Sequence, residues 1–463
     1  MQVLSVAQLG GAPLKLCLDA TPGLNIQLVV LFLDTHEQRI GHSMAPANRN
    51  QTCDIPPETA HLRLGLRVYG SGTAAITALL LGHRNLQPST LLAKARHLLL
   101  TNHYPAYDDL YRNGFVHTRV IAYQKRGIAV DVFRLRANQS AGYQEFENVD
   151  VMTGSQDSLV KMLESGSYNV VLVHFLDPSM WEVLRRYAQS IRIIVWVHGA
   201  EIQPWWRRVY NSNSEEHRQL AKLDSEKRLH FWHNLLAPMP ANLKLVFVSR
   251  HFAEEVMEDL GFRLPDAQYE IIHNPIDTVL FSYEEKPVEQ RRKILSIRPY
   301  ASAKYANDLS VRAIELLALK PYFAELEFHL VGDGTLFEET LAPLRKYPNV
   351  KIENRFLRQQ EIAALHKQYG IFLCPSRADT HGVSRDEAMA SGLVPITNGV
   401  TAIPEFVDER CAILAPANDA EALAAGIARL VETPQLFHEL SMAARARIER
   451  QTSMNRILAQ ELN

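Results

Sequence analysis

Two acidic residues, Asp379 and Glu387, lie eight positions apart in the segment 375–392, which reads PSRADTHGVSRDEAMASG. An apolar run of strand length precedes the segment, so we expect Asp379 in a loop and Glu387 at the start of a helix. Carboxylates accept paired hydrogen bonds from hydroxyl groups, which suits the diol of a ribose or a pyranose. Near the helix start, Gly382 can present free backbone N–H groups to a phosphate. We interpret the third acidic residue, Asp386, as a charge that complements the helix dipole.

A second glycine-bearing turn follows the apolar segment 328–334, FHLVGDG. In a doubly wound sheet, ligands bind at the carboxyl ends of the strands, and glycine lets a backbone approach a phosphate or a sugar closely. Gly332 and Gly334 are therefore candidates for donor binding. A tight turn between a strand and a helix explains the two glycines equally well.

The spacing in 375–392 resembles the E-x7-E donor site of family 4 glycosyltransferases, which are retaining enzymes with the two-domain GT-B fold. The resemblance implies that Asp379 lies beside the transferred sugar and that Glu387 holds the ribose hydroxyls. It also implies that the diphosphate meets the loop formed by Thr380, His381, Gly382 and Val383. Asp379 stands where the family usually has Glu, which keeps the charge and shortens the reach.

The run LSIRPYASAK at 295–304 resembles the family's strand that ends in Arg and is followed by Lys. In the family, such a pair neutralises the donor diphosphate, so the resemblance assigns this role to Arg298 and Lys304. Two cations stabilise the charge of a leaving group without a metal ion. The spacing between them is one residue longer than the family pattern predicts.

Two further segments of this half resemble the family. The run IIHNPID at 271–277, followed by Phe281, is similar to the signature at the crossover between domains, with Pro275 where Gly is usual. It predicts a stiff hinge. Leu357 and Arg358 stand where family members contact the nucleobase, often through backbone groups, although Arg358 fits a surface position equally well.

The first half carries a histidine at the end of an apolar strand. His198, in VWVHGAE, resembles the family histidine between the domains, beside the reacting face of the sugar. The run YRNGF resembles the glycine loop that faces the donor phosphate, with Gly114 for close approach and Asn113 or Arg112 for polar contact. A strand-end histidine with a purely structural role is the alternative for His198.

Paired tryptophans precede a long polar helical stretch. Trp205, Trp206 and Arg207 suit either a glycan-stacking acceptor cleft or a membrane interface. Packing of a helical insertion onto its own domain explains these residues equally well.

The elements that must position these residues change character near residue 93. Residues 1–92 alternate apolar and polar positions between turn signals such as Pro56-Pro57 and Gly70-Ser71-Gly72, which predicts a small all-β sandwich. After it, strand-length apolar runs alternate with helical stretches, which is typical of parallel sheets. We expect strands at 97–101, 129–134, 169–174, 191–198, 243–249, 293–297, 327–332, 350–353, 371–374, 394–397 and 412–414.

These strands predict two Rossmann-like doubly wound domains. The first, 93–283, is the expected acceptor domain, joined by a C-terminal helix at 445–463. The second, 284–444, is the expected nucleotide-sugar domain. The pattern therefore predicts an α/β fold class, and the family resemblance implies that the two domains form a GT-B fold, preceded by the β-sandwich. We expect the sandwich to bind a glycan acceptor or to mediate oligomer formation.

Composition narrows the function classes. Lys plus Arg number 49 and Asp plus Glu 51, so we expect no general binding of nucleic acid. Four scattered cysteines indicate neither disulfides nor a zinc site, which fits a reducing compartment. No apolar run reaches the length of a membrane span. We expect a cytoplasmic protein, with peripheral contact at the inner membrane face as one alternative.

The resemblance implies transfer of a sugar from a nucleoside-diphosphate sugar to a glycan or lipid-linked acceptor, as in bacterial surface polysaccharide synthesis. Neither a cofactor nor a metal is expected, since no D-x-D motif stands in a suitable loop. Two alternatives stay open, a sugar-nucleotide epimerase of the GT-B fold and a carbohydrate-binding protein without catalysis.

Overall fold

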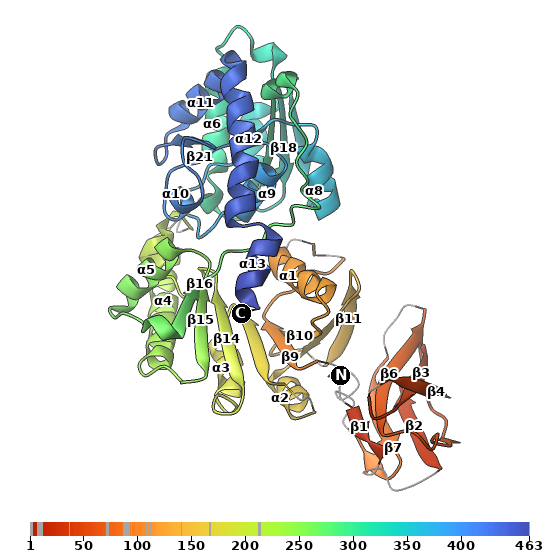
Figure 1. Cartoon of the computed structure of the whole chain (residues 1–463). Coiled ribbons are helices and arrows are strands. Elements are labelled where there is room, and N and C mark those ends of the chain that lie inside the picture. The colour runs from red at the N-terminus through yellow and green to blue at the C-terminus, as the bar shows by residue number, and fades with distance from the viewer. Residues whose placement is uncertain are drawn as a thin grey trace. The chain divides into compact units, whose positions relative to one another are not determined.

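The computed structural model describes residues 3–6, 13–36, 38–70, 74–86, 93, 95–107, 109, 110, 113–139, 141–165, 168–211 and 214–462 (Figure 1). By contacts, the chain divides into two compact units. The first spans 1–104, 123–195 and 241–243, and the second spans 105–122, 196–240 and 244–463. This division differs from the three domains that the sequence predicts, whose boundaries stay a prediction.

The first unit begins with two four-stranded antiparallel sheets, ordered β1-β6-β3-β4 and β5-β2-β7-β8. Alternate residues of β2, β3, β6 and β7 point inward and form one apolar core that both sheets share. Two facing sheets with one core are typical of a β-sandwich. The strands are β1 (Val3–Ser5), β2 (Leu14–Ala20), β3 (Asn25–Leu33), β4 (Arg39–Pro46), β5 (Gln51–Cys53), β6 (His61–Tyr69), β7 (Ile76–Leu81) and β8 (Arg84–Asn85).

An eight-stranded sheet follows, with the order β11-β12-β10-β9-β13-β14-β15-β16. Its strands β9, β10, β12 and β13 pair in parallel, whereas β11 runs antiparallel to β12. The strands are β9 (His97–Thr101), β10 (Val130–Leu135), β11 (Gly142–Phe146), β12 (Val149–Gly154), β13 (Val170–His174), β14 (Arg192–Val197), β15 (Leu243–Phe247) and β16 (Tyr269–Ile271). The helices between them are α1 (Gly114–Lys125), α2 (Gln156–Ser165), α3 (Pro178–Leu184), the 3-10 segment η3 (Trp205–Asn211), α4 (Glu215–Leu236) and α5 (Arg250–Leu260).

A six-stranded parallel sheet forms the centre of the second unit, with the order β19-β18-β17-β20-β21-β22. The reversal of order beside β17 is the topology of a doubly wound fold, which places ligands at the carboxyl ends of the central strands. The strands are β17 (Lys293–Ile297), β18 (Glu327–Gly332), β19 (Val350–Asn354), β20 (Ile371–Leu373), β21 (Val394–Asn398) and β22 (Ile413–Ala415).

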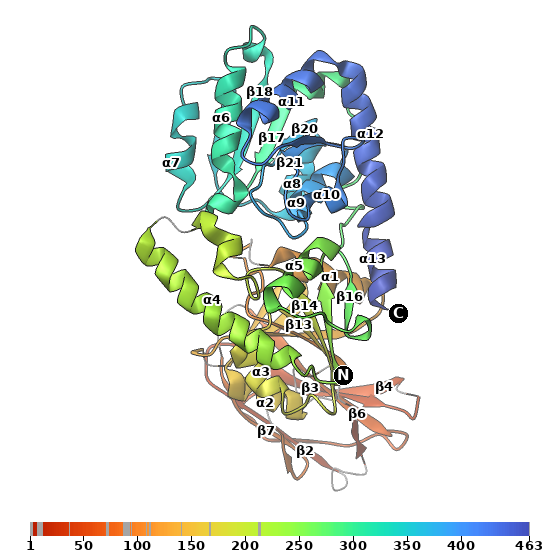
Figure 2. The ribbon, with the colours of Figure 1, turned by 90° about the vertical axis from the view of Figure 1, so that its left-hand side faces the viewer.

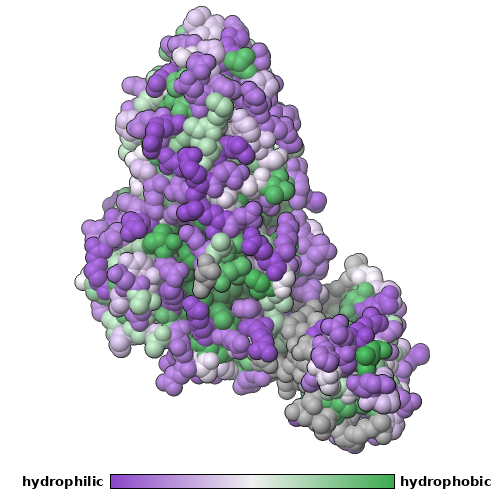
Figure 3. Space-filling model, viewed as in Figure 1, coloured by the Kyte–Doolittle hydropathy of each residue, from purple (hydrophilic) through white to green (hydrophobic). Residues whose placement is uncertain are grey.

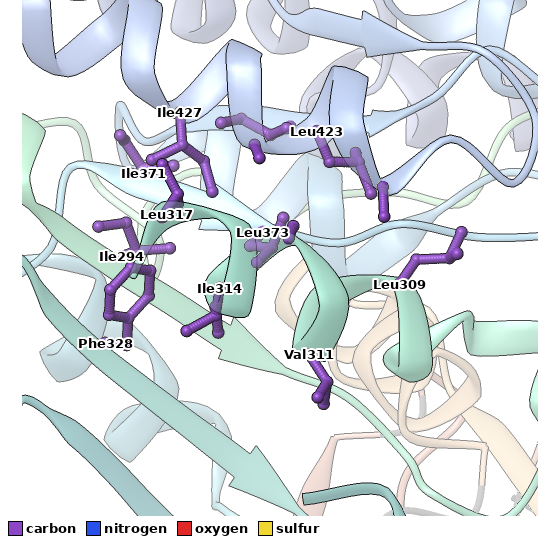
Figure 4. Close-up of a cluster of buried hydrophobic side chains, with 14 of the residues drawn as sticks. Ile294, Leu309, Val311, Ile314, Leu317, Phe328, Ile371, Leu373, Leu423 and Ile427 are labelled. Carbon is purple, nitrogen blue, oxygen red and sulfur yellow. The ribbon is translucent and has the colours of Figure 1, made fainter. Parts of the chain in front are cut away.

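Helices cover both faces of this sheet (Figure 2). On one face, α6 and α11 pack through an aliphatic core that includes Ile314, Leu317, Leu423 and Ile427 (Figure 4). The other face is covered by α8, α9 and part of α12. The helices are α6 (Asn307–Leu317), α7 (Phe337–Leu341), α8 (Gln359–His366), α9 (Val383–Ala390), α10 (Ile403–Phe406), α11 (Ala420–Glu432), α12 (Pro434–Gln451) and α13 (Met454–Glu461). A short 3-10 turn, η6 (Ala303–Tyr305), precedes α6.

The hinge segment around Ile276 is joined to the chain's last turns. The N–H of Ile276 donates to the carbonyl of Thr452 at 2.9 Å, and the N–H of Met454 donates to the carbonyl of Ile276 at 2.9 Å. The side chain of Ile276 is buried in the same core as Ile448. The turn between α12 and α13 is therefore held on the hinge segment.

Each predicted strand after residue 93 corresponds to an observed one. The sequence analysis missed β11, β12 and β16. β11 is mostly polar and exposed, and β16 has three residues, so neither has the apolar run that the analysis used. The predicted turn at 71–72 and the boundary at residue 92 lie outside the described residues.

The helices of the described ranges include none with the length and apolar character to cross a membrane. The face seen in Figure 3 carries mainly hydrophilic side chains over α11 and α12, with apolar ones scattered among them.

Candidate active site

All the candidate site residues belong to the second unit. The loop after β20 depends on one glycine. Gly382, which precedes α9, has φ +95°, a backbone conformation that favours glycine. A Cβ at this position would stand 2.7 Å from Nη1 of Arg385. The backbone conformation therefore favours glycine in the turn that leads from Asp379 to Glu387, and a side chain there would displace the end of Arg385.

A buried polar cluster holds the same turn. Asp386 is fully buried, and its Oδ1 accepts hydrogen bonds from Nε and Nη2 of Arg385 at 2.9 and 2.7 Å. The backbone N–H of Asn274 donates to Nδ1 of His381 at 3.1 Å, so Nε2 of this histidine carries the proton and donates to Asp386 at 3.0 Å. The His381 ring stacks on Phe406 at 4.1 Å between centroids. The cluster fixes the loop backbone that the sequence analysis assigned to the diphosphate.

Asp386 thus has a larger role than the sequence suggested. It does lie in the first turn of α9, where it complements the helix dipole. Burial by itself would raise the pKa of Asp386, but the Arg385 guanidinium and His381 hold the pKa below its usual value. A buried carboxylate with two partners fixes the positions of those partners, here Arg385 and His381, in addition to complementing the helix dipole.

Glu387 is the available carboxyl of the pair. It is partly exposed on α9, and among the described residues no hydrogen bond or ion pair engages its carboxyl. Burial, with the negative charge of Asp386, raises the pKa of Glu387 to about 8. An unpaired carboxyl held at a site edge is suited to bind hydroxyl groups of a ligand.

Asp379 is ionised and faces two cations. Burial would raise its pKa, but the charges of Lys304 and Arg298 lower the pKa below its ordinary value. Its Oδ1 accepts a hydrogen bond from the backbone N–H of His381 at 3.2 Å. The two acids that the sequence paired therefore differ, since Asp379 has cationic neighbours and Glu387 has an acidic one.

Arg298 and Lys304 share an aromatic support. Cζ of Arg298 lies 4.9 Å, and Nζ of Lys304 5.7 Å, from the centroid of the Tyr305 ring. Arg298 is buried and donates from Nη1 to Oγ of Ser384 and from Nη2 to the carbonyl of Pro375, each at 3.2 Å. Despite the longer loop, the two cations are brought together beside Asp379.

Gly332 and Gly334 are explained by backbone packing. A Cβ on Gly332 would stand 1.9 Å from the carbonyl oxygen of Arg298, and one on Gly334 would stand 2.3 Å from the carbonyl carbon of Tyr300. The N–H of Tyr300 also donates to the carbonyl of Asp333 at 2.8 Å. These contacts explain both glycines by the close approach of the loop carrying Arg298 to β18 and the turn after it, and the donor-binding role of the glycines stays a prediction.

His198 lies directly after β14. Its carbonyl accepts a hydrogen bond from Oγ1 of Thr380 at 2.8 Å, so it meets the donor loop. The backbone N–H groups of His198 and Gly199 donate to the carboxylate of Glu201. The centroid of its imidazole ring lies 4.8 Å from the centroid of the Phe115 ring.

The electrostatic environment keeps the His198 ring neutral. Burial, with the positive charge of Arg119, lowers the pKa of His198 well below its ordinary value. A neutral imidazole can donate or accept one hydrogen bond but does not add a further charge to the two cations.

Other predicted residues have more local roles. Gly114 is the first residue of α1, and a Cβ there would meet nothing within 4 Å, which leaves room for a ligand. Arg112 and Tyr111 lie outside the described residues.

Leu357 is buried in the apolar core, so only its backbone is available, and Arg358 is exposed at the start of α8. Val383 is partly exposed as the first residue of α9.

The tryptophan segment packs largely onto its own helices. Arg207 forms ion pairs with Glu255, Glu258 and Asp259 of α5. Nζ of Lys222 lies 5.0 Å from the ring centroid of Trp205, and Trp206 remains exposed. The packing alternative accounts for Arg207, whereas the acceptor role of the tryptophans stays a prediction.

The sequence analysis missed Arg385, Tyr305 and Arg377, all of which support site residues. Arg385 stands directly beside Asp386 in the sequence, and this adjacent pair of opposite charges was the available signal. Within the described ranges, no group of three or more His, Cys, Asp or Glu side chains could hold a metal ion. Metal independence stays a prediction.

Comparison with known proteins identifies the region that carries most of these residues. Residues 291–433 match the family model described as "Glycosyl transferases group 1". This region is therefore similar to the group 1 glycosyl transferases. The resemblance to GT-B glycosyltransferases that the sequence indicates is confirmed. None of the curated proteins matches the sequence of the chain.

Solved structures share the fold of most of the chain. A sucrose-phosphate synthase from Thermosynechococcus elongatus is 17% identical, with a TM-score of 0.61 over 80% of this chain and 97% of that one. Anabaena HepE, in complex with UDP and glucose, is 16% identical, with a TM-score of 0.57 over 80% and 98%. An E. coli structure described as trehalose-6-phosphate bound with UDP-2-fluoro glucose is 11% identical, with a TM-score of 0.57 over 79% and 98%. At these identities the likeness concerns the fold.

In the group 1 region, two cations lie beside the ionised carboxylate of Asp379, and the unpaired carboxyl of Glu387 stands eight residues further along, on α9. The cations are suited to a diphosphate and the free carboxyl to a diol. The arrangement can therefore hold a nucleoside diphosphate by both of its ends.

Proposed function

We propose that the chain is a retaining glycosyltransferase that moves a sugar from a nucleoside-diphosphate sugar to a hydroxyl group of a glycan or lipid-linked acceptor. One observation carries the proposal. Arg298 and Lys304 converge on Asp379, while the Glu387 carboxyl stays unpaired. The family match at 291–433 supports the same class of reaction.

In the proposed reaction, the bond between the anomeric carbon and the diphosphate oxygen breaks with its electron pair going to the diphosphate. Arg298 and Lys304 stabilise that charge. The acceptor oxygen forms its bond to the anomeric carbon from the same face, and its proton passes to the departing diphosphate oxygen. Catalysis then rests on positioning and electrostatics.

The neighbours support a nucleotide-sugar donor, because HepE is described with UDP and glucose and the E. coli structure with UDP-2-fluoro glucose. Our proposal includes metal independence, a cytoplasmic location with contact at the membrane face, and a role in surface polysaccharide synthesis. It also includes a glycan-binding or oligomer-forming role for the N-terminal sheets. A variant lacking residues 1–92 with full activity on a polymeric acceptor would contradict that last role.

The experiment is a mass-spectrometric screen of the full chain against a panel of nucleotide-sugars and acceptors, with and without EDTA. We expect release of the nucleoside diphosphate and a new glycoside with retained configuration. Arg298→Ala and Lys304→Ala should each lower turnover by more than about tenfold, through lost stabilisation of the leaving group. Wild-type rates in both variants contradict the proposal.

Other products would separate the alternatives. An isomerised donor without a glycoside would indicate an epimerase. Donor binding that Glu387→Ala leaves unchanged, with no turnover on any acceptor, would indicate a carbohydrate-binding protein.

A further inference from the structure

The loop between the two cations is held by an arginine from another segment. Nη1 of Arg377 donates to the carbonyl of Ala303 at 2.8 Å, and the backbone N–H of Arg377 donates to the carbonyl of Lys304 at 2.8 Å. Oγ of Ser376 donates to the same Lys304 carbonyl at 3.3 Å. Two successive peptide groups of η6 are thus tied to the start of the segment that carries Asp379.

The guanidinium of Arg377 is itself fully oriented. Nη1 and Nη2 donate to the two carboxylate oxygens of Asp308 at 2.8 and 2.7 Å. Nε donates to Oδ1 of Asn418 at 3.0 Å. A planar guanidinium held on three sides presents Nη1 to the Ala303 carbonyl in one geometry, which a lysine cannot reproduce.

The opposite side of η6 carries the charges. The Tyr305 ring lies below both Arg298 and Lys304. The next residue, Ala306, adopts φ +47°, so the chain turns sharply directly after the ring. While Arg377 holds the Ala303 and Lys304 carbonyls, the Lys304 side chain lies over the Tyr305 ring and near Asp379.

The stability gained from the ion pair between Arg377 and Asp308 does not by itself explain why Arg377 holds η6. The Asp308 side chain is more than half exposed although that of Arg377 is not, and an ion pair with one partner in water contributes about 1 kcal/mol.

We propose that Arg377 is a positioning residue that orients Lys304 toward the diphosphate of the donor. The inference rests on the proposed function, because it takes the diphosphate as the ligand of Lys304. It assigns to this chain a device in which the segment bearing Asp379 also sets the direction of the second cation.

The test compares diphosphate with monophosphate binding in the full chain. The affinities of UDP, GDP and ADP, and of the corresponding monophosphates, are measured by calorimetry. Lys304→Ala should weaken binding of the preferred diphosphate by about tenfold and of its monophosphate by less. Arg377→Ala should weaken the diphosphate by about three- to tenfold and leave the monophosphate within about twofold. In the double variant the loss should equal that of Lys304→Ala alone, because both changes remove one interaction.

Two variants guard against a folding defect. Arg377→Lys keeps the charge but loses the fork, so we expect an intermediate loss. Asp308→Asn keeps Arg377 and should give a smaller loss in the same direction. Arg345→Ala removes an exposed arginine that pairs with Glu338 at 2.6 Å and should leave both affinities unchanged.

The failures are distinguishable. If Lys304→Ala leaves diphosphate affinity unchanged, or no probe binds, the proposed function fails and the inference fails with it. If Lys304→Ala weakens binding while Arg377→Ala does not, only the inference is overturned. Additive losses in the double variant, or equal losses for diphosphate and monophosphate, also overturn it.

Discussion

At the residue scale, Gly382 couples backbone geometry to the buried cluster. Replacement by Ala would place a side chain at φ +95° and 2.7 Å from Nη1 of Arg385. We expect a stability loss of about 1 to 2 kcal/mol from the backbone and a loss of nucleotide affinity of about tenfold from displaced Arg385. Gly261, with φ +75° and nothing within 4 Å of a Cβ, is the matched control. Gly261→Ala should lower the thermal midpoint only, and equal nucleotide affinities in the two variants would contradict the coupling.

Glu387 predicts a pH dependence with a definite sign. Its pKa of about 8 exceeds the ordinary value of 4.5, so the folded state holds this proton more tightly than the unfolded state. Stability from this group is full below about pH 4.5 and is lost as the pH rises through about 8. Glu387→Gln removes the ionisation, so its thermal midpoint should gain on the wild type as the pH rises over this window. Glu409→Gln, at an exposed position, should show a constant difference. A constant difference for Glu387→Gln would contradict the assignment.

At the element scale, α5 begins on a carboxylate from α10. Glu405 accepts hydrogen bonds from the backbone N–H groups of Arg250 at 2.9 Å and His251 at 3.0 Å. These are two of the free donors at a helix start, and a cap of this kind contributes about 1 kcal/mol. Glu405→Ala should therefore speed amide hydrogen exchange in the first turn of α5 by about fivefold, with the last turn unchanged. Unaltered exchange in the first turn would show that Ser249 alone caps the helix.

Much of the fold could be predicted from the sequence, but some elements and contacts could not. Apolar runs predict every strand of the six-stranded sheet, because strands buried on both faces need them. The spacing of residues in the sequence also predicts the acidic pair Asp379 and Glu387 and the cationic pair Arg298 and Lys304. Each pair lies within one short segment of the chain, so its members are close in the sequence. The role of Arg377 could not be predicted, because its partners Ala303, Asp308 and Asn418 are distant in the sequence and meet it only in the folded chain. The hairpin of β11 and β12 could not be predicted either, because its outer strand β11 is mostly polar and has no alternation of apolar residues.

At the scale of the whole molecule, a buried ion pair joins segments 342 positions apart. Nε of Arg119, on α1, donates to Glu461 of α13 at 2.7 Å, and both side chains are almost fully buried. The Arg119 guanidinium also lies 5.5 Å from the ring centroid of Trp196, two residues before His198. The last helix of the chain thus places a carboxylate against a buried guanidinium of α1.

Removing that partner should be costly, because an unpaired buried charge costs about 3 to 5 kcal/mol. Glu461→Ala should lower the thermal midpoint of the full chain by about 5 °C or more. Glu449→Ala, which removes an exposed partner of Arg445 at 3.9 Å, should change it by about 2 °C or less. The double variant Arg119→Met with Glu461→Leu restores an uncharged, filled interior and should recover most of the loss. If the double variant were no more stable than Glu461→Ala, the loss would reflect missing packing of α13 rather than the stranded charge of Arg119.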